Sequence, residues 1–248
     1  MTICLQLDHV NYSYGAAKIR VLSDVNADFE SGKMYAITGP SGAGKSTLLS
    51  LLAGLDAPSD GVVRFEGEDI ATTGYSKHRR EHVSLVFQDH NLIDYLTPEE
   101  NLRLVNPKAD MKILEDLGLS REESKRNIMH LSGGQRQAVS LVMATLTPID
   151  FLILDEHTAA LDPKTAEIIM ELTDKVVKQK KLTAVMVTHN LRYAVEYGTR
   201  LVMMDRGNII LDKAGEDKKD TSIDDILAIF NKISICLLYT SDAADEGL

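Results

Sequence analysis

The chain has 248 residues, of which 44% are hydrophobic and 26% charged, and it carries a formal net charge of −10. These values are typical of one soluble α/β domain with a full core, and the negative charge argues against nucleic acid as the main partner. No apolar stretch reaches the roughly 20 residues of a membrane-spanning helix, and residues 1–9 show no signal peptide, so we expect a cytoplasmic protein. The two cysteines, Cys4 and Cys236, form no close pair and indicate neither a disulfide framework nor a zinc site.

Apolar and alternating segments predict strands through the first third of the chain. Residues 3–7 and 21–29 are interpreted as antiparallel strands, and residues 62–65 and 83–87 add two more. Residues 34–38 are predicted to form a buried strand, because nearly all of them are apolar.

The segment that follows this buried strand, GPSGAGKST at residues 39–47, fits the phosphate-loop pattern G-x-x-x-x-G-K-[ST]. Glycines let the backbone point N–H groups at phosphate oxygens, and a helix predicted over residues 45–53 adds the charge of its N-terminus. We expect Lys45 between the β and γ phosphates, the Ser46 hydroxyl on Mg²⁺ and Thr47 near the α phosphate. The alternative is a glycine-rich turn that matches by chance, which the flanking strand and helix disfavour. The predicted nucleotide-binding residues here are Gly39, Ser41, Gly42, Ala43, Gly44, Lys45, Ser46 and Thr47.

A second glycine pair, in LSGGQ at residues 131–135, precedes a helix predicted over residues 136–147. Ser132 is a good N-cap and the glycines leave backbone N–H groups open, so this is a second anion site. One chain with one ATP has no clear need of it. Two chains arranged head to tail do need it, because each Ser132 can close over the γ phosphate held by the other chain's Lys45. The alternative, an ordinary helix start, carries little weight because the pentapeptide is rare.

Two acids end a continuous apolar run at residues 151–154, which predicts a central parallel strand. Ligands bind at the carboxyl ends of such strands. Asp155 is placed to hold Mg²⁺ through water, and Glu156 is placed to polarise an attacking water, an effect worth about 10²–10⁴-fold. The alternative is an acid pair at a helix N-terminus, which the phosphate loop upstream disfavours.

The remaining segments complete the expected α/β pattern. Pro163 opens a long helix that ends at about Lys180. Asn208 after Gly207 predicts a hairpin turn. The other predicted elements are mainly helical structure over 98–130, strands over 182–188, 201–205 and 209–212, a solvated loop over 215–220 and an amphipathic helix over 223–233.

Taken together, these motifs resemble the ATP-binding cassette (ABC) family of transporter ATPases over roughly residues 1–235. The resemblance implies an α/β fold with a phosphate-loop, RecA-like core, an antiparallel β subdomain and an α-helical subdomain inserted at residues 88–130. It implies ATP and Mg²⁺ as ligands, and a homodimer or a heterodimer with another ABC ATPase. It also implies integral membrane permease subunits as partners and a place on the inner face of the cell membrane.

The resemblance also assigns roles to single residues. Tyr14 matches the aromatic that stacks on adenine, and Tyr12 is the weaker candidate. Residues 89–98 would face the membrane subunit. His157 is a departure, because proline is commoner there in the family, and it is expected to be structural. The implied catalytic residues are Glu156, His189 and Gln88, the implied Mg²⁺ ligands are Ser46, Gln88 and Asp155, and the further ATP contacts are Tyr14, Ser132, Gly133, Gly134, Gln135 and Asp162.

The two halves resemble different branches of the family. Residues 86–97 resemble the lipoprotein-release and macrolide-export branch, and residues 155–163 resemble ATPases of binding-protein-dependent importers. One hypothesis is a chimera joined near residues 131–137, and the alternative is a real subfamily with both features. Residues 236–248 resemble a translated sequencing adapter and are expected to be non-native. The rival function is a non-transport ABC ATPase coupled to envelope remodelling or cell division.

Overall fold

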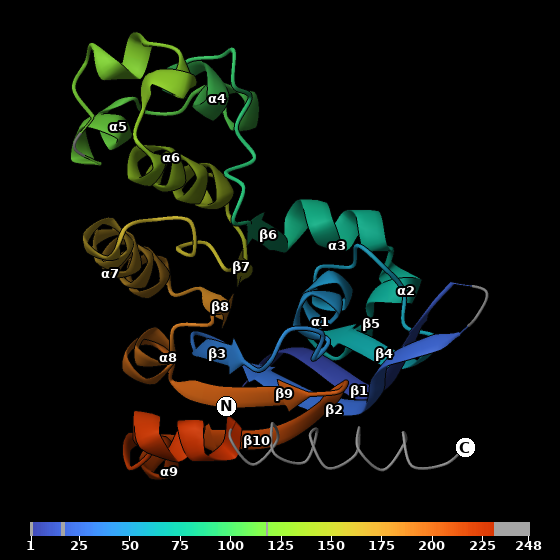
Figure 1. The fold of residues 1–248 in the computed structure, drawn as a ribbon. Helices are drawn as coiled ribbons and strands as arrows, with labels where there is room; N and C mark the ends of the chain where they lie inside the picture. Colours follow the sequence, from blue (N-terminus) through green and yellow to red (C-terminus); the bar gives the residue numbers. More distant parts are fainter. Residues whose placement is uncertain (1, 16–17, 118, 231–248) are drawn as a thin grey trace, which may run out of the picture.

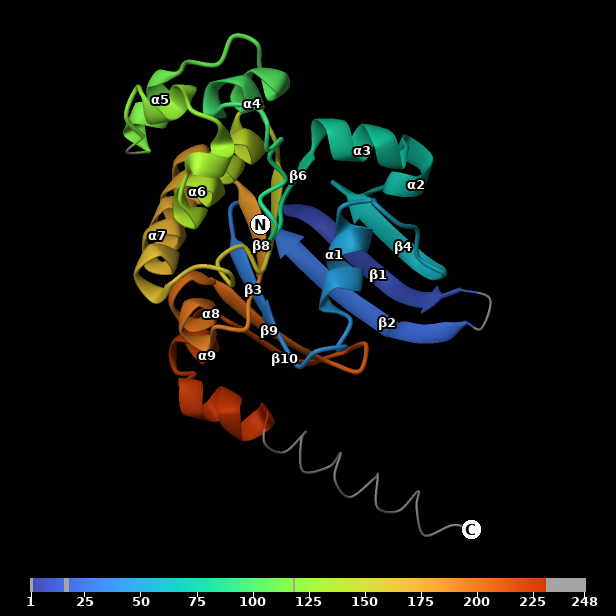
Figure 2. The ribbon, with the colours of Figure 1, turned by 45° about the horizontal axis from the view of Figure 1, so that its top comes forward.

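The computed structural model describes residues 2–15, 18–117 and 119–230. A mixed, mainly parallel sheet in the order β10-β9-β3-β8-β7-β6 lies beside an antiparallel sheet in the order β2-β1-β4-β5 (Figures 1 and 2). The strands of the mixed sheet are β3 (Met34–Thr38), β6 (Val83–Val86), β7 (Phe151–Asp155), β8 (Thr183–Val187), β9 (Arg200–Asp205) and β10 (Asn208–Ala214). The strands of the antiparallel sheet are β1 (Ile3–Tyr14), β2 (Ile19–Glu30), β4 (Asp60–Phe65) and β5 (Glu68–Asp69).

The central strands are apolar because both of their faces are buried. On β3, Tyr35 and Ile37 pack into a core shared with α1 and the antiparallel sheet, while Met34 and Ala36 pack into a second core. The period of two along a strand sends successive side chains to opposite faces. The second core is covered by α7, α8 and a helix over 223–230. The helices outside the helical subdomain are α1 (Lys45–Leu52), α2 (Ile70–Thr73), α3 (Tyr75–Glu81), α7 (Pro163–Lys180), α8 (Leu191–Tyr197) and α9 (Gly215–Lys219).

A helical subdomain joins the mixed sheet through α6, which contacts β6, and has its own core (Figure 1). Leu102, Leu114 and Ile128 are fully buried there, against Val139 and Val142 from α6. The subdomain comprises α4 (Pro98–Val105), α5 (Lys112–Asp116), the 3₁₀ turns Glu123–Lys125 and Ile128–His130, and the packed face of α6 (Gly133–Thr145). The predicted fold class is confirmed: a phosphate-loop α/β core with an antiparallel β subdomain and an α-helical insert.

The structure corrects two predictions. The strand predicted over 83–87 does not join the antiparallel sheet: β6 pairs in parallel with β7, because Val83 packs into one core of the mixed sheet and Val86 into the other. The loop predicted over 215–220 is the helix α9. Gly215 supplies a left-handed entry with φ 58°, and acids in the first turn and lysines in the last complement the helix dipole.

Other predictions fall partly or wholly outside what the structure describes. The helix predicted over 223–233 is present over 223–230. Cys236 and the predicted non-native tail at 236–248 lie outside the described residues. Within the described ranges, no helix is both long and apolar enough to cross a membrane.

Candidate functional site

The phosphate loop joins the end of β3 to the start of α1. Gly39, Gly42 and Gly44 have φ of 149°, 77° and 98°, which L residues with side chains rarely adopt. A Cβ on Gly39 would also lie 2.2 Å from the Met204 carbonyl oxygen, so only glycine fits there. These glycines place Ser41 and Ala43 in a tight curl before a helix N-terminus that has no side-chain cap. Backbone N–H groups at such an end attract anions.

Lys45 is buried at the first position of α1. Its Nζ donates hydrogen bonds to the carbonyl oxygens of Gly39 and Pro40, both at 2.9 Å. Burial lowers the pKa of this ammonium, and the nearby carboxylates of Glu156 and Asp155 oppose that shift. The phosphate loop therefore surrounds the Lys45 ammonium, which is placed to contact the phosphates of a bound nucleotide.

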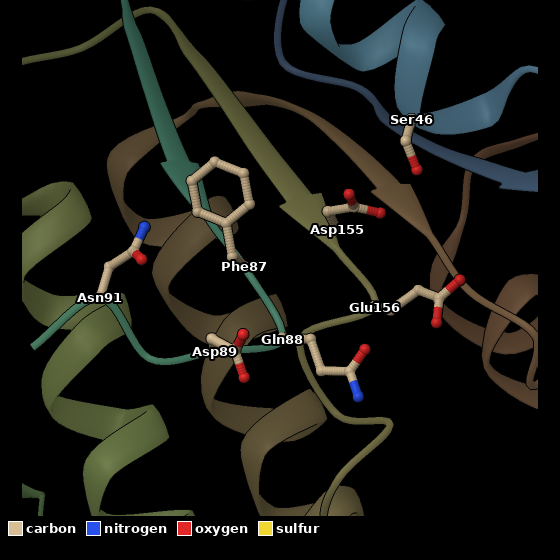
Figure 3. Close-up of a pocket in the computed structure, with 7 residues that line it drawn as sticks. All are labelled: Ser46, Phe87, Gln88, Asp89, Asn91, Asp155 and Glu156. Carbon is tan, nitrogen blue, oxygen red and sulfur yellow. The ribbon is translucent and has the colours of Figure 1, made fainter.

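The acidic end of β7 faces the loop across a pocket of about 510 Å³. Strands β6, β7 and β8 run parallel, so their carboxyl ends meet at this edge. The pocket is lined by Ser46, Phe87, Gln88, Asp89, Asn91, Asp155 and Glu156 (Figure 3). The structure thus brings together the three predicted Mg²⁺ ligands, which come from widely separated parts of the sequence.

The two acids at this edge differ in their surroundings. Burial raises the pKa of Asp155 and the charge of Glu156 raises it further, whereas Lys45 and His189 lower it. Glu156 has a left-handed backbone with φ 50°, and its N–H donates to the Val187 carbonyl oxygen at 3.0 Å. Its side chain turns toward β8, where His189 Nε2 lies 2.7 Å from Glu156 Oε1. The predicted catalytic acid and histidine are therefore in direct contact.

His157, the next residue, points away from the pocket. It is 2% exposed and its Nε2 lies 3.2 Å from the Thr173 hydroxyl on α7. Burial lowers its pKa to about 4, so the ring is neutral at pH 7. The expected structural role of His157 is confirmed.

A pair of tyrosines stands beside the phosphate loop. Tyr14 is 49% exposed and its hydroxyl lies 3.2 Å from the Thr47 hydroxyl. Tyr12 is buried, packs edge-on against Tyr14 with ring centroids 4.8 Å apart, and donates a hydrogen bond to Asp56. Because the exposed ring is the one free to meet a base, the geometry favours Tyr14 over Tyr12 for stacking. Asp56 was not among the predicted residues, since nothing local marks a partner 44 positions away.

The LSGGQ residues form the start of α6. The Ser132 hydroxyl accepts from the Gln135 N–H at 3.2 Å, and the Ser132 N–H donates to Gln135 Oε1 at 2.9 Å, a capping box. Gln135 Nε2 donates to Glu123 at 3.0 Å, a contact that the sequence did not reveal. Gly133 faces Leu161 and Gly134 faces Thr165, so both glycines lie against the region that opens α7.

Asp162 caps α7, with its Oδ1 accepting from the Thr165 N–H at 3.1 Å. Neither Asp162 nor residues 132–135 line the pocket that holds Ser46 and Asp155. One chain therefore presents a phosphate loop with its acidic edge, and separately a capped helix start next to the Asp162 loop.

The parallel sheet, the phosphate loop at its carboxyl edge and the acid pair opposite define a phosphate-loop nucleoside triphosphatase. A family model described as "ABC transporter" matches residues 22–159. The chain is 38% identical over 228 residues to the "Tyrosine transport ATP-binding protein" of Clostridioides difficile, covering 85% of this chain and 90% of that protein. It is 35% identical over 228 residues to the "Phosphonates import ATP-binding protein PhnC 1" of a Ruegeria species, covering 84% of this chain and 88% of that protein.

Among solved structures, the chain resembles the dimeric post-hydrolysis state of the ATP-binding cassette MJ0796 bound to ADP and Pi. The TM-score is 0.74 and the identity 31%, over 85% of this chain and 98% of that one. The chain belongs to the ABC transporter family. It is an ATP-binding and ATP-hydrolysing subunit of a transporter, as the motifs predicted.

Proposed function

We propose that this chain is the ATPase of an importer for a small organic solute. The supporting observation is similarity across nearly the whole chain to proteins named for tyrosine transport and for phosphonate import. One relative matches 85% of this chain, a span that reaches both sides of residues 131–137, and this match supports a single continuous cassette rather than a chimera. Val86 from the front half packs with Leu152 and Leu154 from the back half, as expected of a chain with one origin.

The proposed nucleotide site is built from the phosphate loop and the edge opposite. Loop N–H groups and Lys45 hold the phosphates, and Tyr14 stacks on adenine. Ser46, Gln88 and Asp155 present a hydroxyl, an amide and a carboxylate to one pocket, the oxygen donors that Mg²⁺ prefers. Among the described residues no three His, Cys, Asp or Glu side chains cluster as metal ligands, but one carboxylate suffices where phosphates supply the other oxygens. Bound there, Mg²⁺ would neutralise phosphate charge.

Hydrolysis is proposed to depend on Glu156 and His189. The Glu156 carboxylate accepts a proton from water as the water oxygen bonds to the γ-phosphorus and the bond to the ADP oxygen breaks. His189 lies 2.7 Å from that carboxylate, so it is placed to orient Glu156. Its contact with the γ phosphate is proposed from the resemblance to the family. Gln88 lines the same pocket as Glu156 (Figure 3). Its proposed role is to position the attacking water.

Two chains are proposed to enclose two ATP molecules head to tail. The Ser132 hydroxyl and the N–H groups of Gly133 and Gly134 would close over the γ phosphate in the partner's pocket. These residues do not line the pocket of their own chain, which supports this arrangement, because the start of α6 is then available to a phosphate held by a second chain. Asp162 lies at the same surface, and the second chain is a copy of this one or another ABC ATPase.

The membrane partner is proposed to dock on the helical subdomain and the edge of the sheet beside it. A groove of about 260 Å³ lies between β6 and α6. Leu104, 58% exposed, adjoins Val105, which lines this groove, and the same subdomain also exposes Tyr95 at 78% and Met129 at 64%. A permease segment laid across this region would place the complex on the inner face of the membrane.

The decisive test is Glu156→Gln, compared with Glu171→Gln, the same change at an exposed position on α7. We expect Glu156→Gln to lower the ATP hydrolysis rate by about 10²–10⁴-fold and to accumulate an ATP-bound dimer in sedimentation. The Glu171→Gln control should hydrolyse ATP normally. Hydrolysis at an unchanged rate by Glu156→Gln would remove Glu156 from its role. Co-purification of a multi-span permease would support the transport function. Co-purification of a partner without a solute path would support the envelope-remodelling alternative.

A further inference from the structure

A single buried amide joins the Gln88 segment to the helix that carries the signature. Gln137 lies in the second turn of α6 and is 0% exposed. Its Nε2 donates to the Phe87 carbonyl oxygen at 3.4 Å, and its Oε1 lies 2.6 Å from His90 Nδ1. The two contacts bracket Gln88 on both sides along the chain.

The contacts fix which atoms donate and accept. A carbonyl oxygen can only accept, so the Gln137 amide must present its NH₂ group to Phe87 and its oxygen to His90. His90 Nδ1 therefore carries a hydrogen and donates it to Gln137. The buried amide thus has a partner at each end, and loss of either partner would leave a polar atom unpaired in the interior.

The bracketed segment touches the nucleotide pocket directly. Phe87, Gln88, Asp89 and Asn91 all line that pocket, and the Gln88 side chain shares it with Asp155 and Glu156 (Figure 3). Gln88 is itself exposed, so its position depends on how its neighbours are anchored.

The other end of the connection is rigid. Gln137 lies five positions after Ser132 on the α-helix α6, about one and a half turns along it. A displacement of α6 therefore moves the signature N–H groups and the Gln137 amide together. The remaining link between β6 and α4 over residues 87–97 has no helix or strand of its own.

We propose that Gln137 is a positioning residue that makes Gln88 and the signature helix move as one unit, so that a correctly filled pocket also orients Ser132 toward a second chain. This inference rests on the proposed roles of Gln88 and Ser132. His90 completes the connection by holding the second end of the amide.

The test compares Gln137→Leu, which has a similar volume but no hydrogen bonds, with Thr145→Val on the same helix. Among the described residues, the hydrogen bonds of Thr145 go to carbonyl oxygens of α6 and to Lys180, and none goes to residues 87–91. We expect Gln137→Leu to lower kcat for MgATP by about tenfold or more, the scale of one lost buried hydrogen bond, with KM changed less than twofold. The Thr145→Val control should keep both constants.

A second readout separates positioning from simple destabilisation. In the Glu156→Gln background, Gln137→Leu should raise the dimer dissociation constant by about tenfold while ATP affinity stays within twofold. His90→Ala should weaken dimerisation in the same direction. His90→Asn should restore it, because the asparagine amide can donate to Gln137 as Nδ1 does.

Wild-type kcat and dimerisation in Gln137→Leu would overturn the inference, as would equal behaviour of His90→Ala and His90→Asn. If Gln137→Leu does not fold, the two His90 variants decide the matter alone. Failure of the proposed function is distinguishable: in that case the unmodified chain would not hydrolyse ATP, or Glu156→Gln alone would not dimerise.

Discussion

Gly134 in the signature has no room for a side chain because of Thr165 on the neighbouring helix. A Cβ on Gly134 would lie 2.2 Å from Thr165 Cγ2, more than 1 Å inside ordinary contact, and the next nearest atom, Thr165 Cβ, is at 3.6 Å. Gly134→Ala should therefore cost about 1–3 kcal/mol of overpacking, offset by at most about 1 kcal/mol of improved helix propensity. Thr165→Ser removes the offending methyl group, so alanine should then fit.

The assay is urea unfolding of the four proteins of this double-mutant cycle. We expect Gly134→Ala alone to lose about 1–2 kcal/mol, and the double variant to be no less stable than Thr165→Ser, giving a coupling of about 1–3 kcal/mol. For a chain of this size that loss corresponds to a Tm change of about 2–8 °C. A coupling below about 0.5 kcal/mol would refute the steric account, because independent sites add within that margin.

Three further predictions concern the nucleotide and pH. Lys45→Ala should weaken ATP binding by about 10–100-fold in calorimetry, because a charge-assisted contact is lost, and undiminished affinity would contradict the phosphate-loop assignment. Tyr14→Ala should weaken ATP binding by about 5–150-fold while Tyr14→Phe keeps most of it, and an equal loss in both would rule out stacking. Burial lowers the pKa of His78, so the unfolded chain takes up a proton first and the free energy of unfolding should fall as pH drops from about 7 to 5. That slope, at most about 1.4 kcal/mol per pH unit for one proton, should be shallower in His78→Gln, and an unchanged slope would show that His78 does not contribute.

Features coded by neighbouring residues could be predicted from the sequence. The helix predicted from Pro163 to about Lys180 has those bounds in the structure, because Asp162 supplies the cap and Pro163 suits the first turn. The central strands were equally clear, since burial on both faces leaves a continuous apolar run. The order of the motifs was enough to assign the family.

Features decided by distant residues could not be predicted. The sequence of β6 does not show which sheet it joins, because only the parallel register with β7 determines that. No motif in the neighbouring sequence identifies Glu123 or Gln137, because their hydrogen-bond partners are brought close only by the fold. Short helices such as α8 and α9 were missed because tertiary contacts stabilise helices this short more than propensity does.

Because the helical subdomain has its own core, it can lose stability separately from the nucleotide-binding core. Leu114 and Ile128 pack with α6 and not with the sheets, so a cavity there loosens a unit that the phosphate loop does not need for its own shape. Such local units open at lower free energy than the whole protein. Substitutions in this cluster should therefore give chains that bind nucleotide at full affinity but no longer couple nucleotide binding to a second subunit.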